Sequence, residues 1–241
     1  MSEAPHADRT GVVVVIPALN EGQRIQATVR AARSLGSVAA VFVVDDGSRD
    51  DTAARATAGG ATVVRHAGRR GKAAAMTTGA SAAKAAGFVG EAVLFLDADL
   101  EDTASNAGPL IDAVLDGTAD MAIATIPRTG PSAGHGFVVR LAARGIERRS
   151  GWQPAQPLSG QRCITRPLFD RLTPLARGFG VEVGLTVDAL AAGARVRECP
   201  VDIRHRETGT SLRDQWHRAK QYRDVWMALR RRRGEGFTDS G

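Results

Sequence analysis

The chain has few aromatic residues, only two cysteines and no long run of apolar residues. Because aromatic residues account for 5% of the 241 residues, we expect a core built mainly from Val, Leu, Ile and Ala. No stretch approaches the roughly 18 consecutive apolar residues that a membrane-spanning helix needs. Cys163 and Cys199 are not spaced as a metal-binding pair, and residues 1–9 lack the charged-then-apolar pattern of a signal peptide. We therefore expect a cytoplasmic protein.

Two common nucleotide-binding motifs are also missing. Gly71-Lys72 would belong to a P-loop only with a glycine where His66 stands and a hydroxyl residue in place of Ala73. Gly178-Phe179-Gly180 has its next glycine at position 184, which is one residue late for a dinucleotide-binding fingerprint. We therefore do not expect ATP or NAD to bind in the usual ways.

The composition indicates one soluble domain. The chain is long enough for a continuous core, and its contents of hydrophobic (43%) and charged (24%) residues are ordinary for a globular protein. We see no internal repeat and no interdomain linker. We expect a flexible N-terminus (1–10), a single domain (11–233) with two halves (11–126 and 127–233), and a flexible tail (234–241).

Positive charge is concentrated near the C-terminus. The 32 basic and 26 acidic residues give a net charge of +6, and four arginines form the run 230–233. This run could contact anionic lipid or nucleic acid. Its cations also suit the dipole of a helix that ends there, which is the interpretation we favour. The helix expected from Leu212 carries an apolar stripe that could dock on the core or on a second subunit, so a homodimer is one expectation.

Apolar runs and helical patterns alternate along the chain. The first run, 11–16, is ended by Pro17, and Asn20-Glu21 opens a helix that Gly36 stops. This alternation is typical of an α/β sheet with mainly parallel strands. We expect further strands at 41–44, 61–65, 92–95, 121–126 and 195–203, and later helices at 137–146, 181–192 and from 212 onward.

Two carboxylates, Asp97 and Asp99, directly follow the apolar residues 92–96. They stand at the carboxyl end of a predicted buried strand, where open parallel sheets bind their ligands. On extended backbone, residues i and i+2 share one side and could hold a hard cation between them. Such a cation would neutralise a diphosphate. The alternative is a pair of acids that cap the next helix.

Acids also follow two earlier strands. Glu21 comes after the first strand, and Asp45 and Asp46 come after the second. The carboxyl ends of parallel strands meet at one edge, so we expect all of these acids to converge there. Asp45 or Asp46 could accept hydrogen bonds from a base or a ribose, whereas helix capping alone is the other interpretation.

A basic glycine loop, residues 68–72, follows the third strand. Arg70 and Lys72 in this loop could bind phosphate oxygens. Ser48, with Asp51 three residues later, predicts a capping box at the start of a helix.

The order of these motifs resembles a family 2-type glycosyltransferase. The resemblance covers the first half of the chain and implies a GT-A fold (Rossmann-like), with a mixed, mainly parallel sheet flanked by helices and a C-terminal amphipathic helix. It also implies a nucleoside-diphosphate sugar donor and Mg²⁺ or Mn²⁺ at a DXD motif. The segments that carry it are Val14-Val15-Ile16-Pro17-Ala18-Leu19-Asn20-Glu21, Val43-Val44-Asp45-Asp46-Gly47-Ser48, Gly71-Lys72-Ala73 and Phe95-Leu96-Asp97-Ala98-Asp99.

Two later segments resemble those of glucosyl-3-phosphoglycerate synthases and of dolichyl-phosphate mannose synthase-like enzymes. The segment 156–161 contains Ser159 and Gly160, which by this resemblance lie beside the sugar and acceptor. The segment 178–185 contains Glu182, the candidate general base if the reaction inverts, or a binding residue if it retains. His205 follows a predicted strand and matches a metal-binding histidine in context.

The resemblance implies a hexosyltransferase that uses a UDP- or GDP-sugar. The acceptor is not identified by the sequence; we expect a small phosphorylated or hydroxylated compound or a lipid phosphate. A sugar-phosphate nucleotidyltransferase and a non-catalytic nucleic-acid-binding module are the alternatives. Asp99 and Glu182 are the expected catalytic residues, and the expected metal ligands are Asp97, Asp99 and His205. The expected substrate-binding residues are Pro17, Leu19, Glu21, Asp45, Asp46, Arg70, Gly71, Lys72, Asp97, Ala98, Ser159, Gly160 and Arg206.

Overall fold

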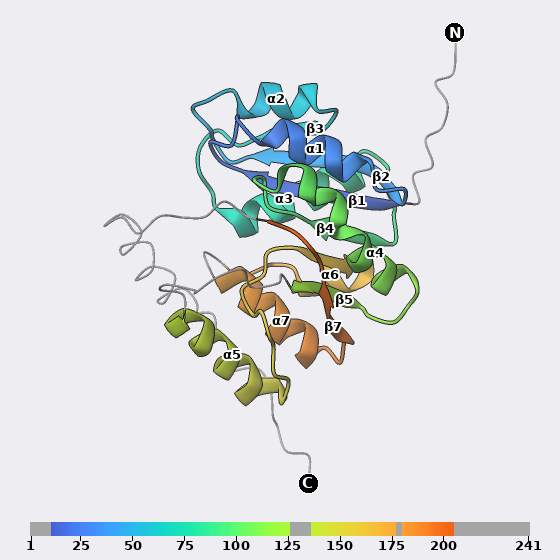
Figure 1. Ribbon diagram of the computed structural model, residues 1–241, viewed down its shortest axis with the longest axis vertical. Coiled ribbons are helices and arrows are strands. Elements are labelled where there is room, and N and C mark those ends of the chain that lie inside the picture. The colour runs from blue at the N-terminus through green and yellow to red at the C-terminus, as the bar shows by residue number, and fades with distance from the viewer. Residues whose placement is uncertain (1–10, 126–135, 177–179, 205–241) are drawn as a thin grey trace.

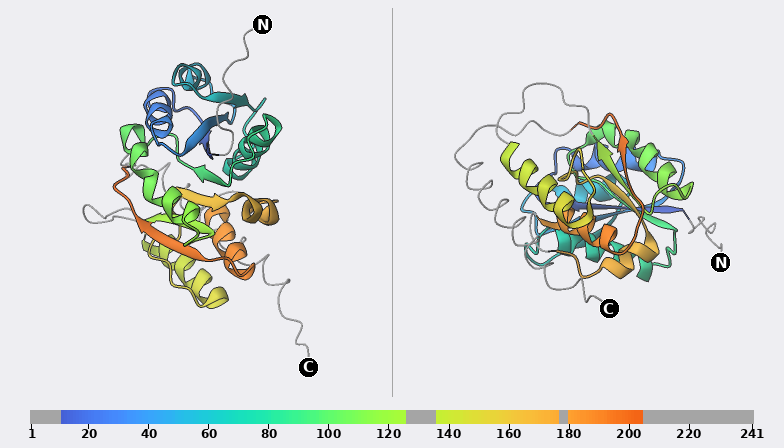
Figure 2. Two further views of the ribbon diagram at one scale, coloured as in Figure 1. Left: turned by 90° about the vertical axis from the view of Figure 1, so that its right-hand side faces the viewer. Right: turned by 90° about the horizontal axis from the view of Figure 1, so that it is seen from below.

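The computed structural model describes residues 11–125, 136–176 and 180–204, which form a sheet with helices on both faces (Figures 1 and 2). Within the described residues, seven strands pair in the order β3-β2-β1-β4-β6-β5-β7. The strands are Val12–Ala18 (β1), Val38–Asp45 (β2), Thr62–Arg65 (β3), Ala92–Phe95 (β4), Met121–Thr125 (β5), Arg162–Thr165 (β6) and Val196–Pro200 (β7).

The helices connect the strands and cover the sheet. They are Ile25–Arg33 (α1), Thr52–Ala58 (α2), Lys72–Ala85 (α3), the 3-10 helix Glu101–Ala107 (η1), Gly108–Leu115 (α4), Gly136–Ser150 (α5), Arg166–Leu172 (α6) and Val181–Ala191 (α7). No described helix is both long and apolar enough to cross a membrane. The helix expected from Leu212 lies outside the described residues.

The sheet is mixed and mainly parallel, as predicted. Among the described strands, β6 runs antiparallel to both of its neighbours, β4 and β5, and every other adjacent pair is parallel. The carboxyl ends of β1, β2 and β4 therefore meet the beginning of β6 at one edge. Phe95 pairs with Arg162 there, so the segment before β6 lies beside the residues that follow β4.

Alternate residues of β1 face two separate cores. Val12, Val14 and Ile16 pack with α1, α2, η1 and α4 on one side of the sheet. Val13 and Val15 pack with α3, α6 and α7 on the other side. This alternation follows from the two-residue period of an extended strand. A Cβ at Gly79 of α3 would lie 2.4 Å from Val15 Cγ1, so glycine allows α3 to approach the sheet.

The strand β1 continues through Pro17, which differs from the prediction that Pro17 ends it. The Val15 carbonyl accepts a hydrogen bond from Leu96 N at 3.2 Å. Alternate residues point their backbone groups to the same side, so those of Pro17 also turn toward β4. Pairing with β4 stops at Val15, and the missing N–H of Pro17 therefore removes no bond between strands.

The predicted capping box at Ser48 is wrong. The helix α2 begins at Thr52, and its N-cap residue Asp51 makes no side-chain capping bond. Ser48 Oγ instead accepts a hydrogen bond from Asn20 N at 2.9 Å. The hydroxyl thus joins the loop after β2 to the loop after β1, a tertiary contact that local sequence rules do not include.

Candidate active site

Lys72 joins the two halves of the chain. It is the first residue of α3, and its Nζ lies 2.8 Å from Asp97 Oδ1, after β4, and 2.9 Å from Glu182 Oε1, in the first turn of α7. Burial of the ammonium acts to lower the pKa of Lys72. The carboxylates of Asp97 and Glu182 outweigh that effect and hold the pKa above its usual value. Lys72 is therefore a permanent cation between two acids.

The segment before β6 completes the surroundings of Asp97. Gln161 Nε2 donates to Asp97 Oδ2 at 2.7 Å, and Ser159 Oγ donates to Gln161 Oε1 at 3.3 Å. A Cβ at Gly160 would lie 2.6 Å from Lys72 Nζ and 2.8 Å from Asp97 Oδ2. A side chain at position 160 would thus displace the ion pair, which gives a steric reason for glycine there.

A buried threonine of α1 fixes the turn that carries Ala98 and Asp99. Thr28 Oγ1 donates to the Ala98 carbonyl at 2.9 Å and accepts from Glu101 N at 2.8 Å. Thr28 is fully buried. These bonds hold the backbone of the DXD motif against α1, while Asp97 and Asp99 remain partly exposed at the sheet edge.

The donor set fits a hard divalent cation. Two carboxylates on one turn match the preference of Mg²⁺ and Mn²⁺ for oxygen ligands, and they leave coordination positions for phosphate oxygens. The described residues contain no group of three or more His, Cys, Asp or Glu side chains placed to hold a metal. Asp97 also binds Lys72 and Gln161. His205 and Arg206 lie outside the described residues.

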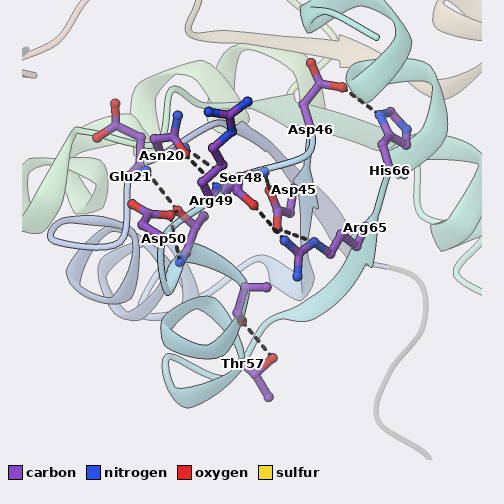
Figure 3. A network of polar contacts seen from close by, with 12 residues as sticks. Asn20, Glu21, Asp45, Asp46, Ser48, Arg49, Asp50, Thr57, Arg65 and His66 are labelled. Atoms are coloured by element: carbon purple, nitrogen blue, oxygen red, sulfur yellow. Dashed lines mark hydrogen bonds and ion pairs between the residues drawn. The ribbon is translucent and has the colours of Figure 1, made fainter. Parts of the chain in front are cut away.

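The acids after β2 are buried and bonded within the protein (Figure 3). Asp45 is 0% exposed; its Oδ1 accepts from Ser48 N at 2.7 Å, and its Oδ2 lies 3.2 Å from Arg65 Nε. That second contact lacks hydrogen-bond geometry, and no described residue donates a hydrogen bond to Asp45 Oδ2. This atom is a buried acceptor in need of a donor.

Asp46 binds the basic glycine loop. Its carboxylate accepts from His66 Nδ1 at 2.7 Å, from Arg70 N at 2.8 Å and from Gly71 N at 2.7 Å. Burial acts to raise the pKa of Asp46, but the bonds from His66 and the two amides outweigh it and lower that pKa. Arg70 itself is exposed at the loop surface, which leaves its guanidinium accessible to a phosphate.

The loop after β1 is shaped by contacts from α2 and the turn before it. Asn20 adopts a left-handed conformation (φ 56°), and its Oδ1 accepts from Arg49 N at 2.9 Å. Glu21 N donates to Thr52 Oγ1 at 2.9 Å, and the Glu21 carboxylate pairs with Arg24 at 3.4 Å. Pro17 and Leu19 are partly buried at the same edge.

A buried arginine supports the second half of the site. Arg162 is 1% exposed and donates to the Ser159 carbonyl and to Thr186 Oγ1, at 2.8 and 2.7 Å. Burial lowers the pKa of Arg162 to about 10, while Glu182 and Glu198 act in the opposite direction. Glu198 also accepts from two backbone amides of the segment before β6, at 2.8 and 2.9 Å.

The structure brings Lys72, Asp97, Gly160 and Glu182 together, and it adds supporting residues that the sequence did not single out. Two of these residues carried a visible signal. Arg162 directly precedes the apolar residues Cys163 and Ile164, and Thr28 interrupts the apolar face of α1. Gln161, His66 and Glu198 had none. The supporting residues are Thr28, His66, Gln161, Arg162 and Glu198.

Comparison with known proteins gives consistent matches. Residues 13–171 match the family model described as Glycosyl transferase family 2. Glucosyl-3-phosphoglycerate synthase of Mycobacterium tuberculosis is 34% identical over 77% of this chain, and the chain spans only 62% of that relative's length. Glycosyltransferase AglJ of Haloferax volcanii is 29% identical, over 83% of this chain and 65% of the relative.

Two crystal structures of the mycobacterial synthase are similar in fold. The complex with Mn²⁺, uridine diphosphate and phosphoglyceric acid has a TM-score of 0.75 at 29% identity, covering 98% of this chain and 81% of that one. The complex with Mg²⁺ and uridine diphosphate has a TM-score of 0.74 at 29% identity, covering 98% and 82%.

Proposed function

The chain belongs to glycosyl transferase family 2, and on that premise we propose that it transfers a hexose from a nucleoside-diphosphate sugar to a small phosphorylated acceptor. The observation that carries the proposal is Lys72, which touches both the DXD motif and Glu182. The ammonium of Lys72 can therefore contact both the departing diphosphate and the incoming acceptor. The structures of relatives with uridine diphosphate and phosphoglyceric acid support this class of substrates. Family membership favours transfer over both alternatives, nucleotidyl transfer and nucleic-acid binding.

We assign the nucleoside to the edge formed by Pro17, Leu19, Glu21 and Asp45. Asp45 Oδ2 needs a hydrogen-bond donor, and the ring N–H of uracil or guanine is such a donor. Arg65 covers this oxygen with a side chain that is 58% exposed, so it can move aside for a base. This favours a UDP- or GDP-sugar as the donor.

We assign the diphosphate to the basic loop and the DXD motif. Arg70 is exposed beside the Gly71 amide, and Lys72 stays charged because of its two acidic neighbours. Asp99 and Asp97 would hold Mg²⁺ or Mn²⁺, with His205 as a further proposed ligand. A divalent cation there would supply Lewis-acid stabilisation to the leaving diphosphate.

Glu182 and the segment containing Ser159 and Gly160 are assigned to the acceptor side, together with Arg206. The Glu182 carboxylate lies 2.9 Å from the ammonium of Lys72, which orients it toward Lys72 and the DXD motif. A Glu182→Gln variant separates two roles. Loss of a general base would lower kcat strongly, whereas loss of an acceptor contact would chiefly raise the acceptor KM.

A turnover assay tests the proposal. UDP-glucose and GDP-mannose would each be incubated with 3-phosphoglycerate or a polyprenyl phosphate, with and without Mn²⁺, and the released nucleoside diphosphate measured. We expect metal-dependent release, with a small phosphorylated acceptor preferred to a lipid phosphate. Asp99→Ala should abolish turnover, while Asp102→Ala, at an exposed acid nearby, should not. Undiminished turnover in Asp99→Ala would overturn the assignment. Homodimer formation and membrane contact by residues 230–233 stay predictions.

A further inference from the structure

His66 is a buried titratable residue among those that support the site. It directly follows β3 and is 6% exposed. Its backbone N–H donates to the Asp45 carbonyl at 2.9 Å, so the ring is fixed beside the end of β2. In Figure 3 the ring points toward Asp46 from the neighbouring strand. A buried imidazole that is hydrogen-bonded through both nitrogens either fills space in the core or fixes the positions of its two partners.

Both ring nitrogens of His66 have partners. Nδ1 lies 2.7 Å from Asp46 Oδ1, and Nε2 lies 3.0 Å from Thr78 Oγ1 on α3. A carboxylate can only accept, so Nδ1 carries a proton. In the neutral ring Nε2 then accepts from the Thr78 hydroxyl. The imidazole therefore connects the end of β2 with α3 through two hydrogen bonds.

Asp46 in turn binds the basic glycine loop, residues 68–72, to which we assign the diphosphate. Its two oxygens accept the amides of Arg70 and Gly71. Gly71 has a φ of 94°, which favours glycine, and it immediately precedes Lys72. A Cβ at Gly47 would lie 3.1 Å from the Gly68 backbone, so the turn after β2 also packs directly on this loop. The direction in which Lys72 leaves the loop thus depends on where Asp46 is held.

We propose that His66 is a positioning residue for the donor diphosphate. Through Asp46 it fixes the Arg70 and Gly71 amides and thereby the placement of Lys72 between Asp97 and Glu182. This inference rests on the proposed function. It assigns the His66 ring to the phosphate end of the donor, because the hydrogen bonds of the ring go to Asp46 and Thr78. The contact of His66 with Asp45, at the nucleoside end, comes from its backbone N–H, which a side-chain substitution keeps.

Two amide substitutions separate the two nitrogens of His66. The amide nitrogen of Asn lies near the position of Nδ1, so His66→Asn can still donate to Asp46. The longer Gln places its amide nitrogen near Nε2, so His66→Gln keeps a partner for Thr78 and loses the bond to Asp46. Thr78→Val removes only the second bond and serves as the matched control.

The experiment compares UDP with uridine. In the presence of Mn²⁺, isothermal titration with UDP should show binding weakened by about tenfold or more in His66→Gln, as expected for loss of a hydrogen bond to a charged group. Uridine affinity, measured by ligand-observed NMR, should be unchanged. His66→Asn and Thr78→Val should each bind UDP within about threefold of the wild type, since they keep the bond to Asp46.

Equal weakening of UDP and uridine in His66→Gln would show a general structural role and overturn the proposal, as would unchanged UDP binding. Amide hydrogen exchange at Gly71, measured without any ligand, tests the same inference independently of the proposed function. We expect faster exchange in His66→Gln than in His66→Asn, and equal rates in both variants would contradict the inference. If the wild-type chain bound no nucleotide while Gly71 still responded, the proposed function alone would fail.

Discussion

At the carboxyl end of β2, carboxylates are buried and backbone amides bind them, whereas beside β6 a guanidinium is buried and carbonyls bind it. Asp46 accepts two amides of the basic loop. Arg162 donates to Ser159 O and Thr186 Oγ1. In the first half the buried Asp46 fixes the backbone of the basic glycine loop, and Arg70 stays exposed there. In the second half the buried cation holds a segment against Asp97. The two arrangements meet at Lys72.

The largest expected effect is on Arg162. Arg162→Met leaves the Ser159 carbonyl and Thr186 without their donor and removes a buried cation near two acids. We expect the free energy of unfolding to fall by about 3–5 kcal/mol, because each buried acceptor that loses its donor costs about 1–3 kcal/mol. Urea unfolding would measure it. The comparison change in the first half, Arg55→Met, should leave the free energy of unfolding almost unchanged, because both side chains of its ion pair with Asp51 are about half exposed. Equal losses would remove the distinction between the halves.

The second largest effect is expected for Lys72, which pairs with both Asp97 and Glu182. Lys72→Met leaves Asp97 and Glu182 with no ammonium between them, so we expect turnover to fall by about 100-fold or more. The free energy of unfolding should fall less than in Arg162→Met, because the Lys72 side chain is 30% exposed. Lys84→Met, at the other end of α3 and 68% exposed, is the control and should keep full turnover. An active Lys72→Met variant would show that the halves do not cooperate through this residue.

Steric crowding at Gly160 predicts a smaller effect. In Gly160→Ala the new methyl group would meet Lys72 Nζ and Asp97, so we expect a loss of about 1–2 kcal/mol in unfolding free energy together with slower turnover. Gly108→Ala is the control, because no atom lies within 4 Å of a Cβ there. Stability can be followed by thermal denaturation. If Gly160→Ala were as active and as stable as Gly108→Ala, position 160 would not be crowded by Lys72 and Asp97.

Acid stability gives the smallest effect. The pKa of Asp46 is lowered from its ordinary value of 3.8 in the folded chain. Its stabilising contribution is therefore present above that value and is lost as pH falls below it. Asp46→Asn should make unfolding free energy less dependent on pH below about 4. The pKa of Asp120 is lowered by its hydrogen bonds from Arg195, which is exposed. Asp120→Asn should therefore change the pH dependence of the unfolding free energy less than Asp46→Asn does. The reverse order would contradict the buried role of Asp46.

The first half was largely predictable because its motifs are local. The apolar runs of β2 and β4 lead almost directly into their acids, and Glu21 follows β1 after Leu19 and Asn20. A parallel sheet brings such strand ends together whatever their separation in sequence. The role of Asp46 was not predictable, since its partners lie some twenty residues away in the loop and after β3. For Ser48 a local rule predicted a helix cap, whereas its hydroxyl accepts a hydrogen bond from Asn20 N.

The second half was less predictable for a physical reason. The strand β6 has only four residues, begins with a buried arginine and runs antiparallel, so no apolar pattern marks it. The burial of Arg162 depends on Thr186, which is 24 residues away. The family resemblance indicated Ser159, Gly160 and Glu182, but not Gln161, which bonds Asp97.

The central claim is that the first half binds a nucleoside diphosphate together with a divalent cation at Asp99. Isothermal titration of UDP into the wild type and Asp99→Asn, each with and without Mn²⁺, tests it most directly. We predict that Mn²⁺ strengthens UDP binding in the wild type and has little effect in Asp99→Asn. UDP binding that is absent from the wild type, or that responds equally to Mn²⁺ in both proteins, would contradict the claim.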